Sequence, residues 1–497
     1  MSMNFVDRMV GVFFPEAGLR RRRARALLER AYEGAARTDG WRPRRAGASA
    51  NTDHRADARE LRIRARSLVK NVPYITHALR SLVSCTVGTG IEPRSLAKRG
   101  AEVLDTLWSQ WVPQADADGI FDLYGLQAAA YHAMEQDGEV LIRRRVRRPG
   151  DALTVPLQVQ LLEIDWLDSA KQGSASDGGQ IINGIEYDLL GKPRAYWLFS
   201  AHPGEYQGRP LRIDSKPVPA ADIIHLFRPS RPGQGRGITR LAPVIARARD
   251  LMLYEDAELQ RKNLETRLGL VVSGDATQMS NPPDSFGQPA EGGDGKRTYG
   301  DLGVLPSGGI TEVAPGLSMQ QIEPKTSSDY AAYVKLQLHL IAAGIGVPYE
   351  SMTGDMKEVN FSSARIRHID FRRDCEQVQW LVLVPKLCMG LWRWFVDAAV
   401  LGGKVTQADY GVDWSTPRWD YVNPHQDVRA EADQIKSGLL SPSESLRRRG
   451  YKPDLVFAEM GRDLEKMRSS GALELMRLFM SSGQVPAAEP ADTTEET

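Results

Sequence analysis

The residues best suited by type to bind a nucleotide phosphate are Gly295 and Lys296, in the segment EGGDGKRT. A phosphate-binding loop needs a glycine five positions before the glycine of its Gly-Lys step, and a Ser or Thr after the lysine. Ala290 and Arg297 occupy those two positions. The GTG of residues 88–90 is followed by IEP, so it lacks the dinucleotide-binding pattern as well. We therefore expect ordinary loops in both places.

Metal-binding and catalytic patterns are also incomplete. Residues 116–120, DADGI, begin like a calcium loop but lack its fifth-position ligand and its later glutamate. The eight histidines include no H-E-x-x-H pair, and His225 lies in a strand-like pattern where a structural role is expected. Ser67 and Lys70 match S-x-x-K without its partner motifs. The sequence predicts no metal, no cofactor and no enzyme activity, although a carboxylate-based enzyme stays open because such sites leave no pattern.

The composition is that of a globular protein with several domains. The chain has 497 residues, of which 42% are hydrophobic and 26% charged, and its net charge is +1; this length predicts about two to four domains. Cys85, Cys375 and Cys388 are too few and too scattered for a disulfide framework or a zinc site. The start of the chain places an apolar patch before its basic residues, the reverse of a secretory signal, and no apolar run approaches a membrane span. We expect no membrane partner.

Positive charge is concentrated near the N-terminus. Residues 1–70 contain 17 Lys and Arg against 8 Asp and Glu, a net charge of +9. The densest part is LRRRRARALLER, which contains Arg20, Arg21, Arg22, Arg23 and Arg25. Such a segment is either a solvated helix or tail, or an arm that contacts nucleic acid or an acidic partner. The sequence leaves both interpretations open.

The first half of the chain predicts an α+β domain. Residues 38–58 are polar and aperiodic, which indicates a linker, and the helical pattern that follows is interrupted at Pro73. Two more helices are expected, at 101–112 and at 122–138, the second ending at a C-cap glycine. Segments rich in β-branched and aromatic residues come next, with a hairpin at 185–201.

The second half begins with a long predicted helix. Thr239 is a plausible N-cap, and about 28 helical residues would span roughly 42 Å. Its expected apolar stripe consists of Leu241, Val244, Ala248, Leu251, Met252 and Leu259. An aperiodic segment rich in Gly and Pro and then short strands follow, before a second helix near 327–346. That helix is expected to place Tyr333, Leu336, Leu340 and Ile341 on one face.

A third long helix is predicted from Ser362 to about Ala399, with a kink at Pro385. Its expected stripe consists of Phe371, Cys375, Val378, Leu381 and Val382. The C-terminal part is helical, and SPSE at 441–444 matches a capping box. Residues 481–497 have the composition of a disordered tail.

Two long segments carry a family resemblance. Residues 223–260, IIHLFRPSRPGQGRGITRLAPVIARARDLMLYEDAELQ, and residues 336–374, LQLHLIAAGIGVPYESMTGDMKEVNFSSARIRHIDFRRD, resemble portal proteins of tailed double-stranded DNA phages, specifically the lambda family. GEVLIRR, YWLFSAHPG and GLWRWFVDAA add to the resemblance, which extends over roughly residues 5–480. It implies an α+β portal fold with an α/β wing, a two-helix stem, a small β-rich clip and an α-helical C-terminal crown, assembled as a ring.

This resemblance also implies a division of the chain. The expected parts are a basic N-terminal arm at 1–60, a wing at 61–238, a stem helix at 239–268, a clip at 269–324, a second stem helix at 325–348, a tunnel loop at 349–362, a long wing helix and return at 363–424, a helical crown at 425–480 and a disordered tail at 481–497.

The tunnel loop is the part expected to project into a DNA channel. A channel must touch the duplex without gripping it, and clustered basic residues would bind phosphates tightly. Lys357 is the only basic residue of 349–362 and stands among three acids, so a ring of copies would present a collar of mixed sign. The expected DNA-channel residues are Met352, Asp355, Met356, Lys357, Glu358 and Asn360.

The function implied by the resemblance is a ring at the unique capsid vertex, through which DNA is packaged and ejected. Its expected partners are further copies of itself as a dodecamer, double-stranded DNA, the terminase large subunit, the major capsid or scaffold protein, and the head–tail connector. The ring would also nucleate capsid assembly, which takes place in the bacterial host cytoplasm, and would remain in the virion. A packaging nuclease or ATPase is an alternative that the absent motifs disfavour, and a head–tail adaptor ring is disfavoured by the length.

Overall fold

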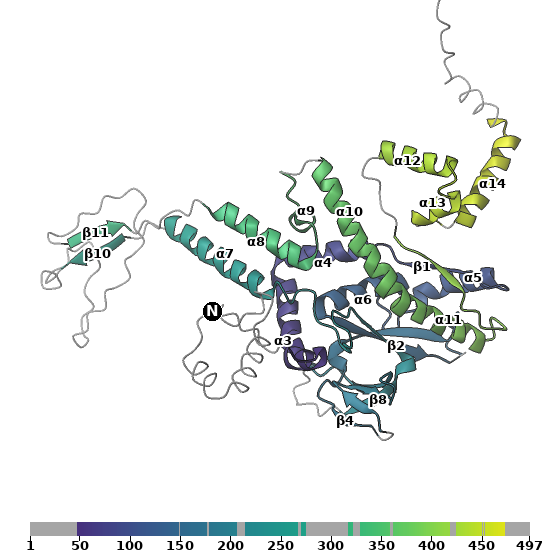
Figure 1. The fold of residues 1–497 in the computed structure, drawn as a ribbon, viewed down its shortest axis with the longest axis horizontal. Coiled ribbons are helices and arrows are strands. Elements are labelled where there is room, and N and C mark those ends of the chain that lie inside the picture. Colours follow the sequence, from purple (N-terminus) through teal and green to yellow (C-terminus); the bar gives the residue numbers. More distant parts are fainter. Residues whose placement is uncertain are drawn as a thin grey trace, which may run out of the picture.

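The structure is a computed structural model, shown in Figure 1. It describes residues 47–148, 150–175, 178–205, 214–266, 270–274, 317–321, 329–357, 361–417, 424–449, 451 and 453–472. Several expectations lie outside the described residues. They are the predicted basic arm with Arg20, Arg21, Arg22, Arg23 and Arg25, most of the predicted clip at 269–324, the predicted channel residues Glu358 and Asn360, and the predicted tail at 481–497.

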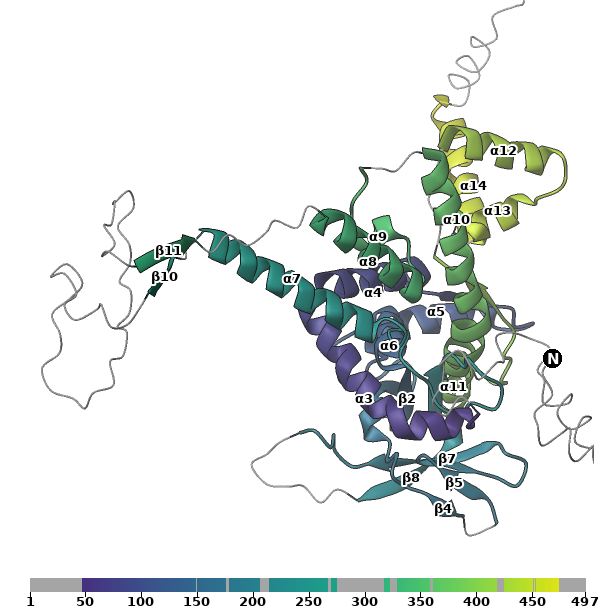
Figure 2. The same ribbon diagram turned by 60° about the vertical axis from the view of Figure 1, so that its left-hand side comes forward.

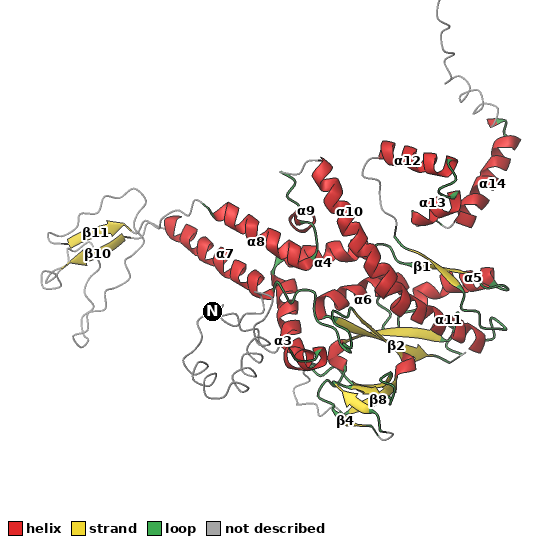
Figure 3. Ribbon diagram, in the orientation of Figure 1, coloured by secondary structure: helices red, strands yellow, loops and turns green. Residues whose placement is uncertain are grey.

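Helices make up most of the described chain (Figure 3). The helices are α3 (Ala50–Asn71), α4 (Pro73–Thr86), α5 (Ala101–Trp111), α6 (Leu123–Asp137), α7 (Ile245–Thr266), α8 (Tyr330–Ile345), α9 (Tyr349–Thr353), α10 (Phe361–Val378), a π-helical segment (Gln379–Cys388), α11 (Met389–Leu401), α12 (Pro424–Lys436), α13 (Pro442–Arg448) and α14 (Pro453–Ser469).

The strands pair in antiparallel fashion throughout the described residues. They are β1 (Glu92–Ser95), β2 (Glu139–Val146), β3 (Leu157–Glu163), β4 (Gly173–Ser174), β5 (Gln180–Ile182), β6 (Ile185–Tyr187), β7 (Pro193–Phe199), β8 (Ser215–Pro219), β9 (Ile223–Phe227), β10 (Leu270–Gly274), β11 (Leu317–Gln321) and β12 (Val412–Ser415). The sheet orders are β3-β2-β9, β4-β5-β6-β7-β8, β1-β12 and β10-β11. The predicted hairpin is β6 and β7.

Part of the segment predicted as a linker, residues 50–58, is helical. Helix α3 already begins at Ala50, because the Ser49 side chain accepts a hydrogen bond from the Thr52 N–H and caps the first turn. The predicted break at Pro73 is confirmed: α3 ends before it, and the proline opens α4.

The three-stranded sheet separates two hydrophobic cores. Alternate side chains of a strand point to opposite faces, so Val140 and Ile142 of β2 lie in the larger core with the helices, and Leu141 lies in the smaller one. The smaller core is closed by the five-stranded sheet, which lies below the helical body in Figure 2. At the end of α6, Gly138 has a φ of 93° and forms the predicted C-cap.

Aromatic side chains fill the centre of the larger core. Trp108 and Trp111 of α5 meet Trp392 and Phe395 of α11, with ring centroids 4.9–5.6 Å apart. The Trp111 Nε1–H donates to the carbonyl oxygen of Leu157 in β3 at 2.7 Å. This cluster therefore ties a helix from the beginning of the chain to one that lies nearly 300 residues later.

Helices α7 and α8 lie side by side and extend away from the body, with the β10–β11 pair at their far end (Figures 1 and 2). Tyr254 of α7 stacks on Tyr330 of α8 with centroids 5.8 Å apart, and its ring meets the Tyr333 ring at 4.8 Å. The two helices therefore form a projecting pair in contact through these tyrosine rings.

The start of α7 corrects the prediction that Thr239 is its N-cap. The helix begins at Ile245, because residues 239–244 are fixed to the end of α6 instead. The Thr239 hydroxyl donates to the Glu135 carbonyl at 3.3 Å and accepts the Leu241 N–H at 3.1 Å. The Arg240 N–H donates to the same carbonyl at 3.1 Å.

The apolar stripes of the two helices are only partly buried. Leu241, Val244, Ala248 and Leu251 are buried as predicted, but Leu259 is 61% exposed. On α8, Ile341 is buried, whereas Tyr333, Leu336 and Leu340 are 43%, 55% and 43% exposed. Each predicted apolar stripe is therefore buried over part of its helix and exposed over the rest.

The third long helix contains a π-helical segment around Pro385, where the sequence predicted a kink and not a change of helix type. Phe371, Cys375, Val378 and Val382 of its predicted stripe are buried. Leu381, however, is 66% exposed, which corrects that part of the stripe. The wider π-turn rotates the following residues relative to an α-helix, so a stripe projected with α-helical spacing fails at this point.

Helices α12, α13 and α14 form a separate group beyond α10 (Figure 1). The predicted cap is confirmed, because the Ser441 hydroxyl accepts the Glu444 N–H at 3.1 Å and Pro442 opens α13. The Ser445 hydroxyl donates to Glu431 of α12 at 2.6 Å, which joins the two helices. None of the helices described here combines the length and apolarity needed to cross a lipid bilayer.

Candidate functional site

The segment predicted as a tunnel loop begins as a short helix fixed to the body. Helix α9 covers residues 349–353, and Met352 is only 1% exposed within the larger core. The Met352 carbonyl oxygen lies 3.1 Å from Nδ1 of His77 on α4. Met352 was expected to face a channel; its burial corrects this, because an apolar side chain in the core anchors the segment instead.

Further contacts fix the base of this segment. The Tyr349 ring stacks on the His339 ring of α8 with centroids 4.0 Å apart. The Tyr349 hydroxyl donates to Asp355 at 3.3 Å, and Glu350 forms an ion pair with Arg367 of α10. The Lys357 backbone N–H, together with the Tyr349 hydroxyl, lowers the pKa of Asp355. The base of the segment is therefore tied to α8 and α10.

The tip of the segment is exposed. Met356 is 65% exposed, Lys357 is exposed and Asp355 is partly exposed. Gly354 has a φ of 75° and ends α9, which turns the chain outward after the anchor. The segment thus joins a fixed base to a tip that carries one cation and one anion within the described residues.

Arg240 contacts three helices close to the segment at 349–357. Its guanidinium donates to Asp374 of α10 at 2.9 Å and to the carbonyl of Ile345 at the end of α8. Glu135 of α6 lies 3.5 Å from Nη1 of the same guanidinium. Burial raises the pKa of Glu135, and the charge of Arg240 opposes that shift. Arg240 therefore connects α6, α8 and α10.

A second buried charge cluster centres on Arg236, shortly before α7 in the chain. The Arg236 guanidinium binds Glu139 through Nη2 to Oε1 at 2.7 Å and Nε to Oε2 at 2.8 Å, and both side chains are almost fully buried. His225 and His54 place Nε2 at 2.9 Å and 3.2 Å from the same carboxylate, and the Gly237 N–H donates at 2.9 Å. His225 is thus a structural residue, as predicted.

The surroundings shift the pKa values of Glu139 and His225. Burial alone would raise the pKa of Glu139, but the charge of Arg236 and the hydrogen bonds from His225, His54 and Arg236 hold it well below its usual value. Burial lowers the pKa of His225 despite the opposing effect of Glu139. The stable state of the cluster is therefore an ionised carboxylate beside a neutral His225.

Acidification should destabilise the protein through His225. Because its folded pKa lies below the ordinary 6.5, the unfolded chain binds the proton first as pH falls. The contribution is present above about pH 6.5 and is lost below it, by up to about 1.4 kcal/mol per pH unit. His225→Gln should make the decline of the melting temperature below pH 6.5 shallower, whereas exposed His425→Gln should leave it unchanged. Equal slopes in the two variants would contradict this assignment.

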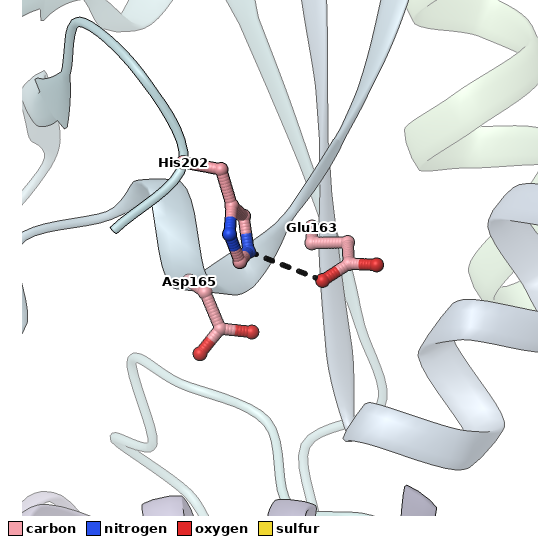
Figure 4. A group of neighbouring side chains, drawn as sticks. All are labelled: Glu163, Asp165 and His202. Carbon is pink, nitrogen blue, oxygen red and sulfur yellow. Dashed lines mark ion pairs between the residues drawn. The ribbon is translucent and has the colours of Figure 1, made fainter. Parts of the chain in front are cut away.

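One group of metal-ligating residues was not predicted. Glu163, Asp165 and His202 come together beside β3, as Figure 4 shows, and the His202 Nε2 lies 3.4 Å from Glu163 Oε2. Arg66 of α3, however, places Nη2 at 3.1 Å from Glu163 and 2.7 Å from Asp165. Its guanidinium already supplies the cation between the two carboxylates. The group is thus an ion-pair cluster, and sequence spacing could not reveal it because Arg66 and His202 lie far from Glu163 and Asp165 in the sequence.

The calcium-like segment is a turn, as predicted. The Asp116 carboxylate accepts the backbone N–H groups of Asp118, Ile120 and Phe121 at 2.8–3.0 Å. The three cysteines are unpaired, and burial raises the pKa of Cys375 to about 12. Its thiol is therefore protonated at neutral pH and unsuited to nucleophilic chemistry.

Known proteins similar to this chain are phage and particle components. A probable portal protein of Halomonas phage phiHAP-1 is 25% identical over 465 residues, which is 88% of this chain and 86% of that protein. Portal protein B of Escherichia phage lambda is 24% identical over 275 residues, 50% of this chain and 51% of that protein. A solved chain from the neck of a native GTA particle with C12 symmetry aligns with a TM-score of 0.44 and 16% identity, covering 78% of this chain and 93% of that one.

The family comparison is the decisive one. The family described as "Phage portal protein, lambda family" matches residues 34–379, which is well over half of the chain. The matched region includes the three-stranded and five-stranded sheets, the helix pair α7–α8, the segment at 349–357 and α10. This chain belongs to the lambda family of phage portal proteins.

Proposed function

We propose that copies of this chain close into a ring at the capsid vertex of a phage, and that double-stranded DNA passes through the centre of that ring. The observation that carries the proposal is the segment Tyr349–Lys357. Its base is fixed by buried Met352 and the Glu350–Arg367 ion pair, and its tip exposes Met356 and Lys357 beside Asp355. A fixed base with a tip of mixed charge suits a surface that must touch moving DNA without retaining it.

Ring closure requires a head-to-tail interface in which one face of the chain contacts a different face of its neighbour. The helices α7 and α8 leave Leu253, Leu259, Leu336 and Leu340 between 43% and 61% exposed. Several large apolar side chains on one projecting helix pair favour burial against another surface. We assign these helices as the stem, β10–β11 as part of the clip, the sheets with α3–α6 as the wing and α12–α14 as the crown.

We also propose further partners, with family membership as the support for them. They are the terminase large subunit during packaging, the major capsid or scaffold protein during assembly, and the head–tail connector in the finished particle. The ring would nucleate capsid assembly in the bacterial cytoplasm, remain in the virion and also serve DNA ejection. Its copy number would be twelve, and its role would be that of a conduit without catalytic turnover.

Replacing Met356, Lys357 and Glu358 with glycine tests the channel role. The buried anchor at Met352 is untouched, so rings should still form. The loss of the tip side chains should lower the amount of DNA packaged per particle several-fold. The measurement is nuclease-protected DNA in particles assembled with the variant, alongside electron microscopy of the purified ring.

A matched control is available at the β6–β7 hairpin turn, where Leu189 and Leu190 are 79% and 82% exposed. Replacing these two residues with glycine should leave both ring formation and packaging unchanged. Normal packaging by the tip variant would show that the segment has no role in the channel.

A further inference from the structure

The face of the three-stranded sheet that carries Leu141 changes from apolar to positively charged along β2. Leu141 lies in the smaller hydrophobic core, but the next residues on the same face are Arg143 and Arg145, and Arg147 continues the alternation just past the strand. These three side chains, here called the arginine ladder, are partly exposed. The five-stranded sheet therefore covers only one end of this face, and the other end presents guanidinium groups.

The residues that pair with the arginine ladder on β3 are neutral. Gln160 lies opposite Arg143 and Gln158 opposite Arg145 on β3. The Arg145 Nε–H donates to the Gln160 amide oxygen at 2.9 Å, and the Arg147 Nε–H donates to the Gln158 amide oxygen at 2.8 Å. The two amides orient these guanidiniums but contribute no negative charge.

Acidic groups do not balance the ladder. Across the residues that the structure describes, Arg143, Arg145 and Arg147 have no carboxylate within ion-pair distance. Burial lowers the pKa of Arg145, and the positive charges of Arg143 and Arg147 lower it further, against the opposing charge of Asp118. Three like charges held this close cost free energy, and the nearby carboxylate of Asp118 offsets only part of it.

The spacing of the ladder suits a repeating anion. Residues two apart on a strand are separated by about 6.6–6.8 Å, so the ladder presents a row of positive charges at a regular interval. A nucleic-acid strand presents a regular row of phosphates, and a guanidinium can bind a phosphate through two parallel N–H bonds. No aromatic side chain stands on the ladder itself, so base stacking is not offered. The fit is to the sugar–phosphate backbone of a duplex, irrespective of sequence.

We propose that the arginine ladder is a second DNA-contacting surface, which binds the phosphate backbone of double-stranded DNA outside the channel formed by the tip at 355–357. The source of that duplex, the genome in the particle, rests on the proposed function. The charge pattern of the ladder does not depend on the proposed function. The two surfaces lie on different elements, the wing sheet and the segment after α9, so each can be tested without altering the other.

The test compares two charge-matched triple variants of the full chain. The ladder variant is Arg143→Gln with Arg145→Gln and Arg147→Gln. The control removes three exposed arginines elsewhere, Arg59→Gln with Arg194→Gln and Arg462→Gln. Binding of a fluorescent mixed-sequence duplex of about 24 base pairs is measured by anisotropy from 50 to 300 mM KCl. Thermal unfolding of both variants checks that the fold is retained.

Three lost phosphate contacts should reduce the slope of log K against log[KCl] by about 2.7, at roughly 0.9 per contact. The ladder variant should also bind the duplex at least about tenfold more weakly than the control at 100 mM KCl. Any binding by the N-terminal arm is common to both proteins and cancels in the comparison.

Equal slopes and affinities for the two variants would overturn the proposal. So would an unchanged duplex slope combined with loss of binding to polyglutamate, since that result would identify an acidic protein surface as the partner. A packaging defect in the tip variant is a separate outcome. If the tip variant packages normally while the ladder variant loses duplex binding, the channel assignment fails and the ladder stands.

Discussion

Glu139→Ala is expected to lower the free energy of unfolding by about 3–5 kcal/mol, the range seen when one partner of a buried ion pair is removed. Arg236 is only 1% exposed and would keep its charge with no carboxylate beside it. His225, His54 and the Gly237 N–H would lose their acceptor at the same time. Chemical denaturation followed by tryptophan fluorescence provides the measurement.

Two further variants separate charge from shape. Glu139→Gln retains an acceptor of the same size and should still destabilise the protein, because Arg236 remains unpaired. Glu60→Ala removes a carboxylate that pairs with Arg64 on the surface at 2.7 Å, where both side chains are more than half exposed, and should cost less than about 1 kcal/mol. A cost of that smaller size for Glu139→Ala would mean that the buried pair contributes little.

Leu336→Glu combined with Leu340→Glu is expected to prevent ring formation while leaving the monomer folded. Both leucines are about half exposed in the single chain, so the substitution does not disturb its core. In the proposed ring they would be covered by a neighbouring subunit, and two carboxylates per interface would be buried without partners at every contact. Native mass spectrometry should show a monomer in place of a ring of about a dozen copies.

The control for this prediction is Leu189→Glu with Leu190→Glu at the exposed β6–β7 turn. This control adds the same charge to two exposed leucines that lie outside the proposed stem. The variant should still form rings. A ring of normal mass from the Leu336 and Leu340 double variant would place the subunit interface elsewhere on the molecule.

Local signals in the sequence predicted local structure well. The break at Pro73, the C-cap at Gly138 and the cap at Ser441 depend on residues within one helical turn, and each is confirmed. The family resemblance was also confirmed, because it rested on two long segments in the correct order. Such features are encoded over short distances or in extended sequence similarity.

Long-range contacts were the part that the sequence could not supply. Thr239 has the residue type of an N-cap, but its hydroxyl binds the Glu135 carbonyl, so the helix begins six residues later. Met352 looked like a loop residue until its position in the core was known. The Glu139 cluster joins residues 85 to 98 positions apart. No local sequence pattern predicts a contact between side chains so far apart along the chain.

The pairing of β1 with β12 has a consequence for how the protein is made. Glu92 pairs with Ser415, so the strand cannot complete its sheet until more than 320 further residues have been translated. At a synthesis rate of about 5–20 residues per second, that delay is roughly 16–65 seconds. During this time the nascent chain must carry an unpaired strand edge near its beginning. The β1–β12 sheet can therefore form only after most of the chain has been synthesised.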